Sequence, residues 1–326
     1  MPHRRQALAL ALAAGLAPAV VRAQSAPAWR PTRPVRLIVP FAPGGSNDIV
    51  GRILTESVSQ ALGQPLVVEN RAGAGSMVGA EHVARSPADG HTVLINSAHA
   101  TVPAIVARMP YDAVNDFAGV AVAGFSPHVL AVNPRLPVQT AQELVALLRA
   151  NPGRYNFASA GLGSGVHVAG ELFRSLTGVE VEIVHYRGGG PGVAALVSGE
   201  SQFGTPTMAS SIGQIRGGGL RALAVLAETR SPVLPDVPSA PEAGLPRLIH
   251  EEFFPILAPA GTPAPVLASL GAAFRQAIRQ NADKLREMAG VTPRDGYDTP
   301  EQVMALVREG VERYTAILRA AGVQPQ

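Results

Sequence analysis

The sequence predicts an α/β protein built as two lobes with two chain crossings between them. Short runs rich in β-branched residues alternate with segments whose apolar residues recur at helical spacing. This alternation is typical of mainly parallel sheets that are covered by helices. The chain has 326 residues, and a single hydrophobic core stops growing at about 250 to 300 residues, so two domains are expected.

The predicted strands are short apolar runs bounded by Gly, Pro, Asn or Ser. The first of them follows a Pro-rich stretch that ends at Pro34, and such a boundary is typical of a strand start. In chain order we predict strands at Val35–Val39, Leu66–Glu69, His91–Ile95, Val120–Gly124, Val129–Val132, Tyr155–Ser159, Glu182–His185, Gln202–Thr205, Arg221–Leu226 and Phe253–Ala258.

The predicted helices lie between these strands and after the last of them. In the segment 49–62, apolar residues recur every three or four positions, which indicates a helix with one buried face. In chain order we predict helices at Ile49–Leu62, Met77–Arg85, Ala141–Ala150, His167–Thr177, Val193–Ser198, Ser210–Arg216, Pro263–Gln280 and Pro300–Ala321.

Two places in this order predict a passage of the chain between lobes. The strands at Val120–Gly124 and Val129–Val132 follow one another with only residues 125–128 between them. A second crossing is expected near Leu226–Arg230, before a Pro-rich loop. We therefore predict one lobe from residues 30–126 and 228–326 and the other from residues 127–227. Two crossings would form a hinge of a few backbone positions, which suits closure around a ligand.

The first 23 residues are predicted to be a signal peptide. His3, Arg4 and Arg5 precede an apolar run that ends in Val21-Arg-Ala23, a small-residue cleavage pattern. The run is shorter than the roughly 20 residues of a membrane span. We expect an exported protein that uses the general secretory route, and the paired arginines leave twin-arginine export open.

Net charge and cysteine content exclude some kinds of partner and some kinds of site. The net charge is +3, and the predicted leader accounts for all of it with three arginines and no acid, so the mature chain is neutral. A neutral surface disfavours nucleic-acid binding. The sequence has 0 cysteines, which excludes disulfides, thiolate metal sites and a cysteine nucleophile.

Four glycine-bearing loops each follow a predicted strand and precede a predicted helix. They contain Gly44-Gly45-Ser46, Gly73-Ala-Gly75-Ser76, Gly161-Leu-Gly163-Ser164 and Gly188-Gly-Gly190. Strand ends and helix starts face one crevice in open α/β sheets, and free N–H groups at a helix start favour an anion. Each loop by itself is also explained as a tight turn with a helix cap. Four of them in both lobes predict a site for a small carboxylate.

Enzyme alternatives find less support. The segment 73–79 follows a strand much as a variant dinucleotide fingerprint does, but the next strand ends in Asn96-Ser97 without the acid that binds a ribose. None of Ser46, Ser76 and Ser164 has a glycine on both sides at the spacing of a nucleophile elbow. The histidines show no metal-binding pair. We therefore predict no catalytic residue, no cofactor and no metal.

Several motifs, spread from about Pro34 to Pro325, resemble the Bug family of tripartite tricarboxylate transporter receptors. They are Val35–Asp48, Gly63–Arg71, Ser86–Leu94, Pro110–Asp112 with Asp116–Phe117, Leu220–Val225, Leu234–Pro238, Glu242–Gly244 and Ala258–Pro263. The resemblance implies a two-lobe type II periplasmic-binding-protein fold (a Venus flytrap). It also implies a monomer that passes its ligand to a membrane permease of the tripartite tricarboxylate type, or that serves a sensing system.

The resemblance implies a ligand site as well. Members hold dicarboxylates, tricarboxylates, acidic amino acids or aromatic acids between the lobes, largely through main-chain and hydroxyl groups. Carried over to this sequence, the ligand contacts are expected at Phe41, Ala42, Gly44, Gly45, Ser46, Asn47, Asp48, Ser97, Ala98, His99, Ser159, Ala160, Gly161, Ser164, Tyr186, Gly188, Thr205 and Pro206.

Two departures from the family pattern bear on the ligand. Gln202 and Pro206 stand where the family usually has acids, so an amino acid is less expected than a plain carboxylate. His99 stands in a loop that is usually small and rich in glycine or threonine. A histidine there would add positive charge near a carboxylate as the pH falls, or it would be an exposed loop residue without a role. The sequence leaves both interpretations of His99 open.

Overall fold

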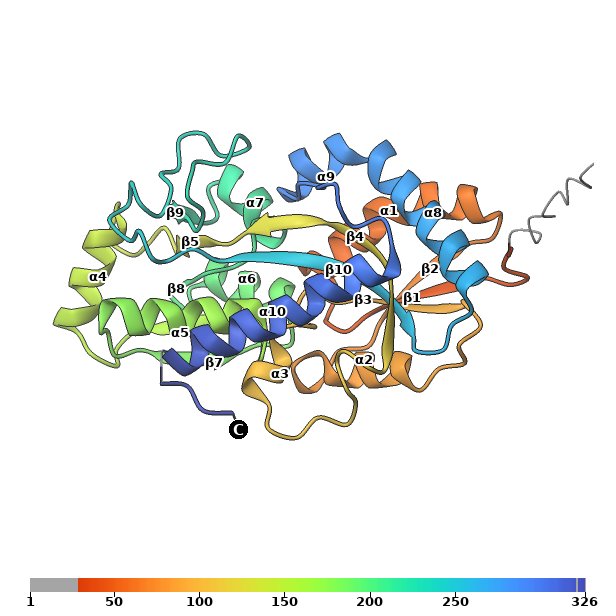
Figure 1. The fold of residues 1–326 in the computed structure, drawn as a ribbon. Helices are drawn as coiled ribbons and strands as arrows, with labels where there is room; N and C mark the ends of the chain where they lie inside the picture. The colour runs from red at the N-terminus through yellow and green to blue at the C-terminus, as the bar shows by residue number, and fades with distance from the viewer. Residues whose placement is uncertain (1–28, 321, 326) are drawn as a thin grey trace, which may run out of the picture.

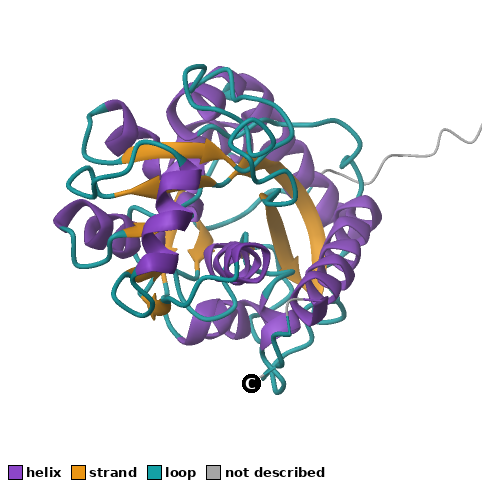
Figure 2. Ribbon diagram, turned by 90° about the vertical axis from the view of Figure 1, so that its left-hand side faces the viewer, coloured by secondary structure: helices purple, strands orange, loops and turns teal. Residues whose placement is uncertain are grey.

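The computed structural model describes residues 29–320 and 322–325. The predicted signal peptide, residues 1–23, and the predicted last helical residue, Ala321, lie outside the described residues. Two five-stranded sheets form the centres of two lobes that lie side by side (Figure 1). Viewed from the end of the second lobe, helices surround the strands (Figure 2).

The first sheet has the strand order β2-β1-β3-β10-β4. Its strands are β1 (Val35–Val39), β2 (Leu66–Asn70), β3 (Thr92–Ile95), β4 (Phe117–Pro127) and β10 (Glu251–Pro259). The helices of this part of the chain are α1 (Ser46–Leu62), the short 3-10 helix η1 (Ala74–Ser76), α2 (Met77–Ala84), α3 (Val102–Ile105), α8 (Ala264–Gln280), α9 (Ala282–Ala289) and α10 (Pro300–Ala320). Strand β10 is antiparallel to both of its neighbours, whereas β1, β2 and β3 pair in parallel.

The second sheet repeats this plan with the order β7-β6-β8-β5-β9. Its strands are β5 (Val129–Val132), β6 (Asn156–Ser159), β7 (Glu182–His185), β8 (Phe203–Gly204) and β9 (Arg221–Val225). Its helices are α4 (Ala141–Ala150), α5 (Gly165–Thr177), α6 (Gly189–Ser198) and α7 (Met208–Arg216). Here β5 is the strand that runs antiparallel to its neighbours. The predicted α/β class with two lobes is therefore confirmed.

The apolar residues of β1 show why helices cover both faces of the first sheet. Leu37 packs in one cluster with Leu54 of α1 and Phe274 of α8. Ile38, the next residue, packs in another cluster with Val307 of α10. Side chains alternate between the faces of a strand, so a strand with apolar residues on both faces requires a helical layer on each side.

The first crossing lies where β4 continues toward β5. The strand was expected to end at Gly124, but it extends to Pro127 because β10 pairs along its length. His128 follows, and its N–H donates to the carbonyl of His250 over 3.1 Å. Leu226 in turn donates to the carbonyl of His128 over 2.8 Å. The two crossings are therefore hydrogen-bonded to each other at the hinge.

The sequence predicted a return to the first lobe near residues 226–230, but the chain does not return there. Leu234 packs in an apolar cluster with Val129 and Val225 of the second sheet. Ala243 and Leu248 pack in another cluster of that lobe. The Pro-rich loop thus belongs with the second lobe, and we place the return crossing at His250-Glu251 instead.

The last helix contacts both lobes. Alpha-helix α10 packs along β4 and also contacts α5 of the second lobe, as its path in Figure 1 shows. Tyr314 and Leu318 of α10 share an apolar cluster with Val168 of α5. Helix α10 therefore lies on the first lobe and reaches across to the second. None of the helices in the described part of the chain is long and apolar enough to cross a membrane.

Candidate functional site

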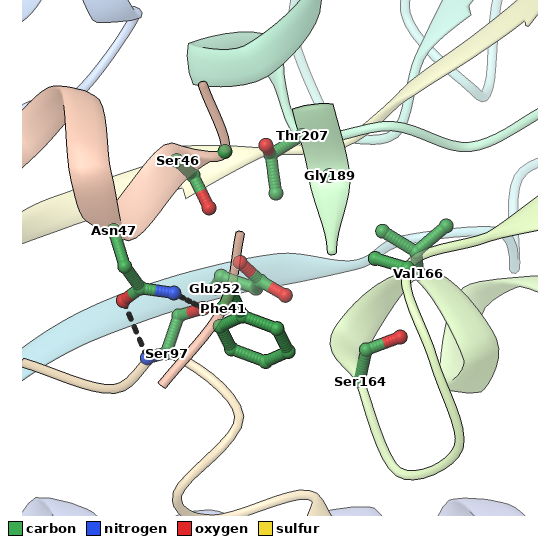
Figure 3. Close-up of a pocket in the computed structure, with 11 residues that line it drawn as sticks. Phe41, Ser46, Asn47, Ser97, Ser164, Val166, Gly189, Thr207 and Glu252 are labelled. Atoms are coloured by element: carbon green, nitrogen blue, oxygen red, sulfur yellow. Dashed lines mark hydrogen bonds between the residues drawn. The ribbon is translucent and has the colours of Figure 1, made fainter. Parts of the chain in front are cut away.

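A cavity lies between the two lobes, next to the hinge. Figure 3 shows its wall, to which β10, the start of α1 and the loop after β3 contribute from the first lobe, and the starts of α5, α6 and α7 from the second. The lining residues are Phe41, Gly45, Ser46, Asn47, Ser97, Ala160, Ser164, Val166, Gly189, Thr207 and Glu252. The cavity itself is small, about 20 Å³, which is room for about one water molecule. It adjoins a hollow of about 420 Å³ between the lobes, which is in the size class of a small-molecule site.

The starts of α1, α5, α6 and α7 converge on this cavity. Ser164 and Thr207 cap α5 and α7, since their hydroxyl oxygens accept from the N–H groups of His167 and Ser210. Helices α1 and α6 have glycine at the N-cap and no side-chain cap. Their first-turn N–H groups are therefore available to a ligand. Each helix start carries about half a positive charge, so the cavity suits an anion.

The loops before α1 and α6 touch across the gap between the lobes. The N–H of Ala42 donates to the carbonyl of Arg187 over 3.1 Å. A Cβ on Gly190 would lie 2.5 Å from the carbonyl oxygen of Pro43, closer than real side chains approach. The Thr101 hydroxyl also donates across the gap, to the carbonyl of Gly163. These contacts describe a closed arrangement of the lobes.

Asn47 joins the start of α1 to the loop after β3. Its side-chain amide donates to the Ser97 hydroxyl over 3.0 Å and its carbonyl accepts from the Ser97 N–H over 2.8 Å (Figure 3). Asn47 is 2 % exposed and Ser97 is 5 % exposed. This reciprocal pair holds two walls of the cavity together.

Replacing Asn47 with alanine is expected to lower the free energy of unfolding by about 1 to 3 kcal/mol, because the Ser97 N–H would be left buried without an acceptor. Urea denaturation of the ligand-free protein measures this loss. Asn115→Ala is the control, since Asn115 is exposed and its side chain bonds only to Asp112 nearby. Equal stability of the two variants would contradict the role given to Asn47.

Asp48 supports the start of α1 without facing the cavity. Its carboxylate accepts from the Gly44 N–H over 3.0 Å, from Asn70 over 3.0 Å and from Arg52 over 3.0 Å. Burial alone would raise the pKa of Asp48, but these hydrogen bonds lower its pKa below the ordinary value. Asp48 is therefore ionised, and it holds the glycine loop before α1 in place.

The predicted contact residues fall into three groups. The cavity wall includes Phe41, Gly45, Ser46, Asn47, Ser97, Ala160 and Ser164. An adjoining hollow between the lobes is lined by Gly161 and Tyr186, together with Phe41 and Ala160, and Gly44 lines a separate groove beside α6. The Tyr186 hydroxyl bonds to Glu200 and Ser201 over 3.0 Å each, away from the cavity.

The remaining predicted residues lie outside the cavity wall. They are Ala42, Asp48, Ala98, His99, Ser159, Gly188, Thr205 and Pro206, none of which lines the cavity. Their polar groups bond within the protein: the Ser159 hydroxyl to Gly161, the Thr205 hydroxyl to the carbonyl of Val166, and the Pro206 carbonyl to the N–H of Val129. Residues at a strand end near the cavity therefore shape its wall without lining it.

His99 has neither of the roles that the sequence left open. It is 0 % exposed, and its ring packs between Tyr111 and Phe117. Its Nε2 lies 2.7 Å from the carbonyl of Ala113, so Nε2 carries the proton. Burial lowers the pKa of His99 to about 4, although the bond to Ala113 opposes the shift. His99 is therefore a neutral core residue at neutral pH.

Four wall residues are absent from the list of expected contacts: Val166, Gly189, Thr207 and Glu252. The first two lie within a residue or two of predicted positions, at helix starts that were placed too late. Thr207 carried a usable signal, because a threonine between a strand and a helix is a typical N-cap. Glu252 also had a signal in the sequence, because it is an acid next to the apolar run of β10.

In the described residues, no group of three or more acids and histidines is placed to hold a metal ion.

Comparison with known proteins identifies the family. Residues 50–323 match the family described as the tripartite tricarboxylate transporter family receptor. The chain is 36 % identical over 298 residues to a protein named BugT from Bordetella pertussis (strain Tohama I), a match that covers 90 % of this chain and 91 % of BugT. The resemblance of the motifs to this family is therefore confirmed.

Solved structures agree in fold. The periplasmic binding protein BugD matches with a TM-score of 0.87 at 28 % identity, over 91 % of this chain and 100 % of BugD. An R. palustris protein solved with adipate matches with a TM-score of 0.86 at 33 % identity, over 91 % of this chain and 99 % of that one. MatC from Rhodopseudomonas palustris, solved with bound malate, matches with a TM-score of 0.83 at 32 % identity, over 88 % and 99 % of the two chains. The chain belongs to the tripartite tricarboxylate transporter receptor family, whose members are periplasmic solute-binding proteins and not enzymes.

Proposed function

We propose that this protein captures a small carboxylate between its two lobes and delivers it to a membrane permease of the tripartite tricarboxylate type. The observation that carries the proposal is the convergence of four helix starts, from both lobes, on one cavity. Two relatives were solved with adipate and with malate, both carboxylates, which supports the same ligand class.

The mechanism follows from where the donors lie. A carboxylate entering the open cleft docks on the first-turn N–H groups of α1, next to Ser46. Closure then brings the starts of α5, α6 and α7 onto the same anion. Each hydrogen bond to a charged group contributes roughly 1.5 to 3 kcal/mol. Bonds that form only in the closed state bias the equilibrium toward it.

Closure also creates contacts that the open form lacks, among them the bond from Ala42 to Arg187. Such contacts give the permease a surface that exists only when the ligand is bound. A receptor that acts in this way needs no second copy, and we propose that it is a monomer. We further propose that residues 1–23 are removed on export by the general secretory route.

A panel of carboxylates tests the proposal by thermal unfolding. A ligand present at 100 times its dissociation constant is expected to add about 2.7 kcal/mol of stability. The panel consists of dicarboxylates, tricarboxylates, acidic amino acids and aromatic acids, with the methyl esters of the same acids as controls. The esters are expected to leave the melting temperature unchanged. If no acid of the panel raises it, the proposed function is wrong.

A further inference from the structure

Glu252 is a buried acid in the wall of the cavity between the lobes. It belongs to β10, directly after the return crossing, and it is 3 % exposed. Figure 3 shows its carboxylate between the start of α1 and the start of α5. Among the described residues, its Oε2 atom has no hydrogen-bond partner. A carboxylate oxygen in this position costs free energy unless a donor reaches it.

The neighbouring histidine lies beside Oε1 of Glu252 and makes no hydrogen bond to either oxygen among the described residues. His128 Nδ1 lies 2.6 Å from the carbonyl of Thr205, so Nδ1 carries a proton, and Nε2 lies 3.5 Å from Glu252 Oε1. His250 packs edge-on against His128 with ring centroids 4.5 Å apart. Neither histidine supplies a donor to Oε2.

The protein makes room for this acid. A Cβ on Gly165, at the start of α5, would overlap Glu252 Oε1. No lysine or arginine belongs to the cavity wall that the structure describes. The missing donor to Oε2 therefore has to come from whatever occupies the cavity.

We propose that Glu252 accepts a hydrogen bond from a donor group of the ligand, so that the receptor selects carboxylates that also carry an ammonium or hydroxyl group over unsubstituted ones. The helix starts bind the carboxylate of the ligand, and Glu252 binds the donor. An unsubstituted acid leaves Oε2 unpaired, and a second carboxylate placed there meets a like charge. This inference rests on the proposed function and refines its ligand class.

It also reverses an expectation from the sequence. The absence of an acid at Pro206 disfavoured an amino acid as ligand. Glu252 supplies an acid from β10, on the first lobe, so the cavity regains a partner for an ammonium group.

Matched acids test this selection by calorimetric titration. The series are succinate, L-malate and L-aspartate; glutarate and L-glutamate; and benzoate, 4-hydroxybenzoate and 4-aminobenzoate. Within the series that binds, a donor-bearing acid is expected to bind about 10- to 100-fold more tightly than the unsubstituted one, the factor for a hydrogen bond to a charged group. Malate against aspartate, or the hydroxy acid against the amino acid, identifies which donor is used.

Two variants assign the preference to Glu252. Glu252→Gln keeps the shape and removes the negative charge, and Gly165→Ala pushes the carboxylate out of place. Both are expected to weaken binding of the donor-bearing acid by about 10-fold or more while the unsubstituted acid binds as well as before or better. Glu251→Gln is the matched control, because Glu251 pairs with Arg294 outside the cavity, and its binding profile is expected to equal that of the wild type.

The outcomes separate the two proposals. A wild type that prefers the unsubstituted acid, or a Glu252→Gln variant that weakens all acids of a series equally, overturns the selection by Glu252 and leaves carboxylate binding intact. If no carboxylate binds the wild type, the proposed function itself is wrong. Melting of the ligand-free variants shows whether each one is folded.

Discussion

Replacing Gly45 with leucine is expected to weaken ligand binding by more than about 100-fold and to leave the fold intact. Gly45 is the N-cap of α1, and a Cβ there would lie 3.4 Å from the N–H nitrogen of Gly189. A leucine side chain extends beyond this atom into the space where α1 and α6 meet around the ligand. It therefore removes several charge-assisted hydrogen bonds at once. Calorimetric titration with an acid that stabilises the wild type measures the loss.

Gly45→Ala is the matched control for this prediction. Gly45 has a φ of −82°, which any residue adopts, so neither substitution strains the backbone. The single methyl group of alanine makes ordinary contacts with its neighbours. We expect Gly45→Ala to bind within a few-fold of the wild type. Full affinity in the leucine variant would show that the ligand does not use the start of α1.

The second large effect concerns acid stability. Burial lowers the pKa of His99 to about 4 from its ordinary value of 6.5. The unfolded chain therefore takes up a proton at this residue at higher pH than the folded protein does. Stability from His99 is fully present above pH 6.5 and is lost as the pH falls toward 4. The difference corresponds to about 3 kcal/mol.

His99→Phe tests this by removing the titration. The variant is expected to be less stable than the wild type at pH 7.5, because the Ala113 carbonyl loses its donor. Between pH 7.5 and 4, however, its free energy of unfolding should fall by about 3 kcal/mol less than that of the wild type. Denaturant titrations at several pH values measure both curves. Other buried histidines such as His250 contribute to both proteins alike and cancel in the comparison.

Tyr111→Phe is the control within the same aromatic cluster. The Tyr111 hydroxyl is buried and has no partner among the described residues, and it does not ionise between pH 4 and 7.5. Its removal should shift the whole curve without changing its slope. Parallel curves for the wild type and His99→Phe would contradict the assignment of a depressed pKa to His99.

The sequence by itself determined the class of fold and most of its elements. Alternating β-branched runs and amphipathic segments are local patterns, and Ala141–Ala150 matches α4 at both ends. Local patterns also led to errors. Helices α5 and α6 begin with glycines that carry no apolar signal, so their starts were placed late. The segment Ala282–Ala289, which forms α9, was missed because it is short and half of its residues are charged.

The suitability of the glycine loops for an anion was likewise predictable, because it depends on backbone N–H groups. Gly45, Ser46 and Ser164 line the cavity. A strand end followed by glycine and a helix presents free N–H groups wherever it occurs. The proposal of an anion site between two lobes therefore followed from residues that are near one another in the chain.

Only the tertiary structure decided which side chains face the cavity. His99 and Glu252 are both polar residues beside apolar strands, yet His99 is enclosed by Tyr111 and Phe117, whereas Glu252 lines the cavity. Glu252 is brought to His128 by two crossings that lie more than a hundred residues apart in the chain. Burial and contact depend on packing between distant segments, and neither spacing nor composition encodes them locally.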